Sequence, residues 1–138
     1  MEIPFLAVPH DTTTVIIDLT TQALAATHLF ADDASVKKYV WFEGKYAAVD
    51  TELQSVKEKL DVYGKTFFDD ICGMTPLQYR DYVQKVYEQK LHAIDADATI
   101  SIATRTLAHS YLSMNYASAL FGFKNNIAMA PMIVRKTG

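Results

Sequence analysis

The chain has 138 residues, a single cysteine and a formal net charge of −3 at pH 7. Half of its residues are apolar and 21% are charged, a balance typical of globular proteins that excludes a disordered chain. This length predicts one domain over residues 1–138. The single cysteine, Cys72, excludes an internal disulfide and fits a reducing compartment.

Other features narrow the classes of partner. The N-terminus lacks the basic, apolar and cleavable run of a signal peptide. The most apolar stretch, residues 100–123, contains Arg105, His109 and Asn115, which argues against a membrane span. The acidic balance and three scattered arginines argue against a nucleic-acid surface. We expect a soluble, intracellular (cytoplasmic) or virion protein whose partners are proteins.

The N-terminal third is ambiguous between helix and strand. Residues 1–10 predict an extended apolar arm, because Pro4 and Pro9 disfavour a helix around them. Residues 12–17 are all β-branched, which favours a strand. However, the apolar residues from Val15 to Phe30 recur at helical spacing. We therefore predict a helix over residues 13–30, with a strand over residues 12–19 as the alternative.

The strongest pattern in the chain is a heptad-like spacing of apolar residues. It predicts one long helix over about residues 34–72, with Gly64 as a candidate break. The apolar residues at this spacing, here called the heptad residues, are Tyr39, Phe42, Tyr46, Val49, Leu53, Val56, Leu60, Tyr63 and Phe67.

The sharpest local boundary follows that helix. Gly73 is suited to a left-handed helix cap. Thr75, Pro76 and Gln78 have the spacing of a capping box with proline at the first helical position. We predict a helix from this box to about residue 94. Its apolar face comprises Tyr79, Val83, Val86, Tyr87, Leu91 and Ile94.

Another helix is predicted over about residues 98–121. It is rich in alanine and serine, whose small side chains let a neighbouring helix approach closely. Its predicted buried face comprises Ile100, Ala103, Leu107, Tyr111, Met114 and Phe121.

Residues 123–138 predict a second extended apolar arm around Pro131. The fold class expected from all these elements is all-α. We predict an antiparallel four-helix bundle over residues 11–122, flanked by arms at residues 1–10 and 123–138.

Candidate sites for chemistry are sparse. Glu88 and His92 share a helix face, but one such pair does not complete a metal site. Cys72 lies at the C-terminus of the predicted helix, where the helix dipole disfavours a thiolate. The adjacent Asp69 and Asp70 point in different directions on a helix. We therefore predict no catalytic, metal or cofactor site and no cofactor.

Residues 73–80 resemble the motif G-x-[ST]-P-x-x-Y-R of AraC-type transcription regulators. The resemblance implies a DNA-binding helix-turn-helix element around residues 64–80. Gly64 and Asp69 depart from the family pattern, which has an aromatic residue and a lysine at these positions.

The function predicted from the sequence is that of a non-enzymatic structural or assembly subunit, such as a virion coat or connector protein or an accessory subunit of a large complex. The alternatives are a small regulatory or inhibitory binding protein, including a DNA-binding one, and a cofactor- or metal-carrying helical-bundle enzyme. Apolar arms suit protein interfaces, and so does Trp41, which lies outside the heptad-like spacing. The candidate partner-binding residues are Phe5, Leu6, Val8, Trp41, Met129, Met132, Ile133 and Val134.

Overall fold

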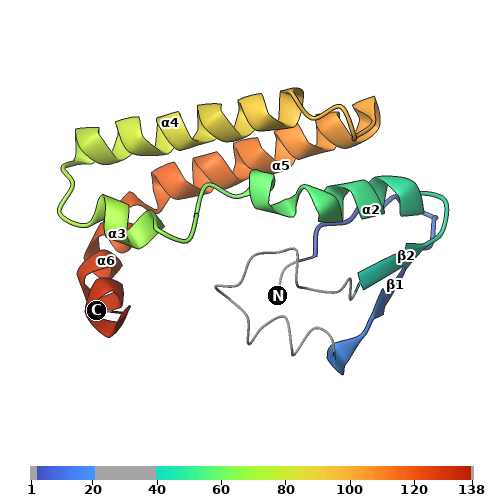
Figure 1. The fold of residues 1–138 in the computed structure, drawn as a ribbon, viewed down its shortest axis with the longest axis horizontal. Coiled ribbons are helices and arrows are strands. Elements are labelled where there is room, and N and C mark those ends of the chain that lie inside the picture. Colours follow the sequence, from blue (N-terminus) through green and yellow to red (C-terminus); the bar gives the residue numbers. More distant parts are fainter. Residues whose placement is uncertain (1–2, 21–39, 138) are drawn as a thin grey trace. The chain divides into compact units, whose positions relative to one another are not determined.

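The computed structural model describes residues 3–20 and 40–137. Within these ranges it contains five α-helices, a short 3-10 helix and a two-stranded sheet (Figure 1). The prediction of a mostly helical chain is confirmed, but the all-α class is wrong because of the sheet. The chain divides into two compact units, Met1–Gln54 and Ser55–Gly138.

The sheet belongs to the first unit. Strand β1 (Thr14–Ile17) pairs antiparallel with β2 (Val40–Glu43), so that Ile16 lies opposite Trp41. The predicted helix is therefore wrong at residues 14–17, and residues 21–30 of that prediction lie outside the described residues. The β-branched run prevails over the helical spacing because pairing with β2 satisfies its backbone groups.

The predicted long helix over residues 34–72 is also wrong, and residues 34–39 of it lie outside the described residues. The segment is instead divided into β2, α2 (Ala47–Ser55), the 3-10 helix η2 (Lys57–Leu60) and α3 (Phe67–Ile71). Gly44 enforces the first break, because its φ of 125° strongly disfavours other residues. A Cβ at Gly44 would lie 2.7 Å from the carbonyl oxygen of Thr12.

The heptad residues are nevertheless mostly buried. Phe42, Leu53, Val56, Leu60 and Phe67 all lie in the interior of their units. The spacing therefore identified buried residues correctly but assigned them to the wrong backbone conformation.

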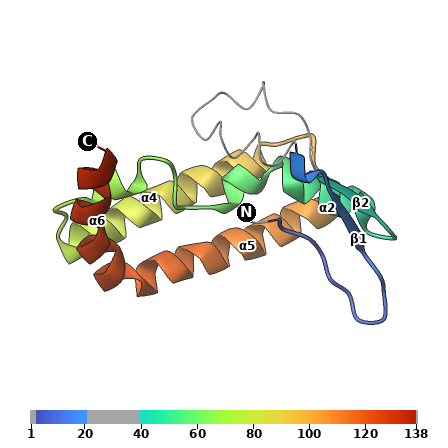
Figure 2. The ribbon, with the colours of Figure 1, turned by 90° about the horizontal axis from the view of Figure 1, so that it is seen from below.

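The second unit is built on two antiparallel helices, α4 (Pro76–Asp95) and α5 (Ile102–Phe121), which run side by side (Figure 1). The 3-10 helix η2 packs against both. Helix α6 (Phe123–Thr137) packs against α3 and runs across the end of the α4–α5 pair (Figure 2). The buried apolar core of this unit comprises Val56, Leu60, Val62, Phe67, Ile71, Tyr79, Val83, Ile94, Ile100, Ala108, Leu112, Ala119 and Ala130.

The predicted start of α4 is confirmed. Gly73 has a φ of 78°, the left-handed conformation expected of it. The amide of Gln78 donates to the Thr75 hydroxyl oxygen at 3.3 Å, and the Thr75 amide donates to Oε1 of Gln78 at 2.9 Å. These two bonds form the capping box, with Pro76 at the first helical position.

The predicted extended C-terminal arm is wrong, because residues 123–137 form α6. Tertiary packing explains the difference, since Ala130 is fully buried and Ile127 is packed against the core. Pro131 lies inside this helix and supplies no N–H to it. The N-terminal arm is partly as predicted, since residues 3–8 carry no helix or strand.

One buried polar cluster joins three helices of the second unit. The hydroxyl of Tyr79, on α4, donates to the carbonyl oxygen of Ala119 on α5 at 2.7 Å. Nδ2 of Asn126, on α6, donates to the same hydroxyl at 2.9 Å. Burial raises the pKa of Tyr79, although the Asn126 hydrogen bond opposes the shift. The cluster therefore depends on a neutral phenol.

Candidate protein-binding face

Helices α4 and α5 have equal lengths, but their solvent-exposed sides differ in charge. The exposed residues of α4 include Arg80, Asp81, Lys85 and Glu88, as expected for a helix that faces water. The exposed residues of α5 include no charged side chain. They are Ile102, Ala103, Thr106, Ser110, Ser113, Met114, Ser118 and Phe121, and together we call them the outer face of α5.

Three large apolar side chains project from this face. Ile102 is 80% exposed, Met114 is 69% exposed and Phe121 is 92% exposed. The residues around them are alanine, serine and threonine. Single exposed apolar residues are common on protein surfaces. A solvent-exposed helix side that combines large apolar residues with a lack of charged residues is unusual, because charged side chains normally keep such a side in water.

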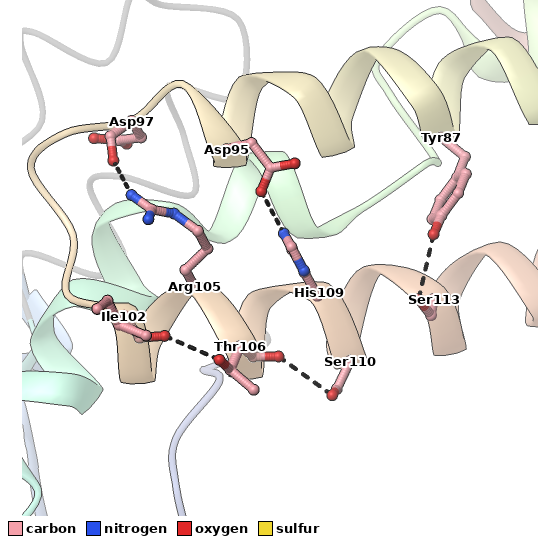
Figure 3. Close-up of polar contacts among 9 residues, drawn as sticks. All are labelled: Tyr87, Asp95, Asp97, Ile102, Arg105, Thr106, His109, Ser110 and Ser113. Carbon is pink, nitrogen blue, oxygen red and sulfur yellow. Dashed lines mark hydrogen bonds and ion pairs between the residues drawn. The ribbon is translucent and has the colours of Figure 1, made fainter.

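The side chains of Arg105 and His109, on α5, are directed towards the loop that precedes α5 and towards α4 (Figure 3). A terminal nitrogen of Arg105 donates to the carbonyl oxygen of Asp97 at 2.9 Å. Nε2 of His109 lies 2.6 Å from Oδ1 of Asp95. These contacts link α5 to α4 and to the loop between them, and they direct both basic side chains away from the outer face.

Three of the four hydroxyls on the outer face, those of Thr106, Ser110 and Ser113, are engaged within the same unit. Thr106 donates to the carbonyl oxygen of Ile102 at 3.0 Å, and Ser110 donates to that of Thr106 at 3.3 Å (Figure 3). The Ser113 hydroxyl lies 3.4 Å from that of Tyr87. Burial of these hydroxyls against a partner would leave few donors unsatisfied, and such burial therefore costs little.

The sequence prediction placed part of this face in the core. It assigned Ala103, Met114 and Phe121 to the buried side of the helix, which is wrong, because all three are exposed. The residues actually buried are Thr104, Ala108, Leu112 and Ala119. The signal that was available is charge, since α5 contains Arg105 as its only Asp, Glu, Lys or Arg.

The candidate residues of the first unit lie in two places. The amide of Leu6 donates to Oδ1 of Asp50 at 2.6 Å, which anchors this segment to α2. Phe5 is exposed, whereas Leu6 and Val8 are half-buried. Trp41 is exposed and lies opposite the exposed Ile16. Trp41 and Ile16 form an apolar cross-strand pair on the exposed side of the sheet.

The candidate residues near the C-terminus all lie on α6. Met129 and Met132 are exposed, and Ile133 and Val134 are half-buried. They therefore belong to a helix that packs within the second unit, and not to a separate arm.

The remaining candidates for chemistry have ordinary surroundings. Oε1 of Glu88 accepts from Nε2 of Gln84 at 3.0 Å, and His92 is exposed. No group of three or more His, Cys, Asp or Glu side chains that could hold a metal is found in residues 3–20 and 40–137. Arg80, in the segment that resembles AraC-type regulators, bonds through Nε and a terminal nitrogen to Oδ1 of Asp81.

No helix in the described part of the chain is long and apolar enough to cross a membrane. Comparison with models of protein families, with curated proteins and with solved structures finds no match in any of the three.

Proposed function

We propose that this protein is a non-enzymatic assembly subunit, whose helical bundle joins a larger homo- or hetero-oligomeric complex through the outer face of α5. The observation that carries the proposal is the absence of charge on this face. Ile102, Met114 and Phe121 are exposed on it, although apolar side chains of this size each favour burial by about 1.5–3 kcal/mol.

The arrangement of polar groups supports binding more than chemistry. A catalytic site needs acids, bases or nucleophiles that converge on a cavity. The two basic side chains of α5 instead contact the loop or α4: Arg105 bonds to the carbonyl oxygen of Asp97, and His109 lies against the carboxylate of Asp95. What remains on the outer face is apolar area surrounded by small side chains, which suits the close approach of another protein surface.

The mechanism is burial of apolar area on a rigid support. Helix α5 is fixed by α4 on one side and by the segment that contains η2 on another. The amide of Val62 donates to Oδ1 of Asn115 at 2.6 Å, which fastens that segment to α5. A face that is already ordered loses little conformational entropy when it binds.

The proposal is tested with the full chain in an extract of the cells that naturally contain it. We expect the wild-type chain to elute from a size-exclusion column above its monomer mass, and the variant Met114→Glu to elute as a monomer. Leu77→Glu is the matched control, because Leu77 is equally exposed but lies on the charged helix α4. Elution of the wild-type chain as a monomer, or of all three proteins together in a large complex, would contradict the proposal.

A further inference from the structure

We infer that the first unit binds a hard metal cation on the buried side of α2, between the side chains of Asp50 and Gln54. The side-chain ligands are Oδ2 of Asp50 and Oε1 of Gln54. The site is formed within the first unit and does not involve the outer face of α5, so it goes beyond the proposed function.

Asp50 is the only charged side chain that is buried in residues 3–20 and 40–137, and its burial is complete. Its Oδ1 accepts a hydrogen bond from the amide of Leu6 at 2.6 Å. Its Oδ2 is also buried and has no hydrogen-bond partner. None of the ion pairs in this part of the chain involves Asp50. A buried carboxylate with one neutral donor is unfavourable unless a positive charge compensates it.

Gln54 brings a second unpartnered oxygen to this side of α2. Its Oε1 is buried and has no hydrogen-bond partner. Residues four apart on a helix lie one turn above each other, which places Asp50 and Gln54 on one face. A carboxylate oxygen and an amide carbonyl oxygen are both acceptors, so neither satisfies the other. A cation that contacts both atoms satisfies both.

The chemistry of the two oxygens selects the class of cation. Hard cations such as Ca²⁺ and Mg²⁺ prefer carboxylate and carbonyl oxygens, whereas Zn²⁺ and softer metals prefer cysteine and histidine. Ca²⁺ suits the site best, because it accepts irregular geometry and completes its shell with backbone carbonyl oxygens and water. Affinity falls with fewer charged ligands, so one carboxylate predicts a Kd for Ca²⁺ of about 10⁻⁴ to 10⁻³ M.

The same carboxylate also anchors the N-terminal segment, because its Oδ1 holds the amide of Leu6. A cation at Oδ2 fixes the orientation of the carboxylate group. Binding should therefore stabilise the bond to Leu6 and slow hydrogen exchange of the Leu6 amide. This effect distinguishes a cation at Asp50 from a cation bound elsewhere on the chain.

The test uses the purified full chain after removal of metals with a chelator. CaCl₂ or MgCl₂ is added, choline chloride keeps the ionic strength constant, and urea unfolding of the first unit is followed by fluorescence of Trp41 in β2. We expect Ca²⁺ at about 10 mM, ten times the weaker Kd, to lower the unfolding equilibrium constant about 11-fold. Mg²⁺ should have a smaller effect, because it demands stricter geometry. Equilibrium dialysis should give one Ca²⁺ per chain.

Three variants locate the cation. Asp50→Asn has nearly the same shape without the charge and should abolish the Ca²⁺ effect. Glu52→Gln is the matched control, because it removes a charge from the opposite side of α2 and should leave the effect unchanged. Gln54→Glu adds a second carboxylate to the site and should lower the Kd for Ca²⁺ at least about tenfold. This gain remains measurable if Asp50→Asn does not fold.

Two results would overturn the cation site. Unfolding of the wild-type chain that does not respond to Ca²⁺ or Mg²⁺ would show that bound water satisfies the two oxygens. An equal Ca²⁺ effect in the wild type and in Asp50→Asn, or no gain in Gln54→Glu, would place the cation elsewhere on the chain.

Discussion

The substitution Tyr79→Phe tests whether the second unit is held together by its buried polar cluster. It removes one hydroxyl and leaves the ring, which packs edge to face against Phe67 and Phe123. The lost hydroxyl leaves the carbonyl oxygen of Ala119 and an amide hydrogen of Asn126 without this partner. A buried polar group deprived of its partner costs about 1–3 kcal/mol, and we expect the free energy of unfolding to fall by that amount.

The assay is urea denaturation followed by far-ultraviolet circular dichroism, with thermal unfolding in parallel. For a domain of about 60–100 residues, each kcal/mol lowers Tm by about 4–8 °C. The control is Tyr116→Phe, because Tyr116 stacks on Tyr87 through its ring and that contact does not involve the hydroxyl. The control should change stability by less than about 0.5 kcal/mol.

A double-mutant cycle extends the test to the coupling between α4 and α6. The variant Asn126→Ala should destabilise the unit by itself, and the double variant should cost less than the two single changes together, because both remove the same bond. Two results would refute the reasoning: a loss below about 0.5 kcal/mol for Tyr79→Phe, or additive effects of the two substitutions.

Three further predictions follow from local geometry. Thr75→Ala should lower the free energy of unfolding by about 1 kcal/mol through loss of the capping box, as measured by urea denaturation. Thr75→Ser should leave the stability close to that of the wild type, because the serine hydroxyl can form the same box. The hydrogen bond from Lys59 lowers the pKa of Asp97 in the folded state, so the unfolded state binds more protons below about pH 4 and this contribution to stability is lost as the pH falls. Asp97→Asn should therefore be less stable than the wild type at neutral pH and converge with it in acid, and an unchanged difference would contradict the assignment. Gly44→Ala should destabilise the sheet by about 1–3 kcal/mol, because the new Cβ would clash with the Thr12 carbonyl. Fluorescence of the single tryptophan, which lies in β2, should then report unfolding at a lower urea concentration. A variant as stable as the wild type would exclude this backbone strain.

Local sequence signals predicted α4 well. Thr75, Pro76 and Gln78 form their capping box with neighbouring residues alone, and Gly73 ends the preceding segment without reference to the rest of the chain. Such signals act over one helical turn, and no distant contact competes with them. The prediction of the buried side of α4 was also correct at Tyr79, Val83 and Ile94, because charged residues clearly mark the opposite, exposed side.

The same reasoning failed for α5, where the exposed side carries no charge. Spacing alone assigned Met114 and Phe121 to the core, because apolar and small residues surround this helix on every side. Burial of Thr104, Ala108, Leu112 and Ala119 within the unit decides which side faces inward. That choice depends on the packing of two helices, and it determined where the candidate binding face lies.

The sequence by itself determined the helical character of the second half, the capped start of α4 and the burial of most of the heptad residues. Tertiary structure alone decided that residues 14–17 form a strand, because their partner strand lies at residues 40–43. It also decided that residues 123–137 form a helix, because α3 supplies a surface for it to pack against. In both cases an apolar segment was compatible with more than one backbone conformation, and contacts with residues distant in sequence selected one of them.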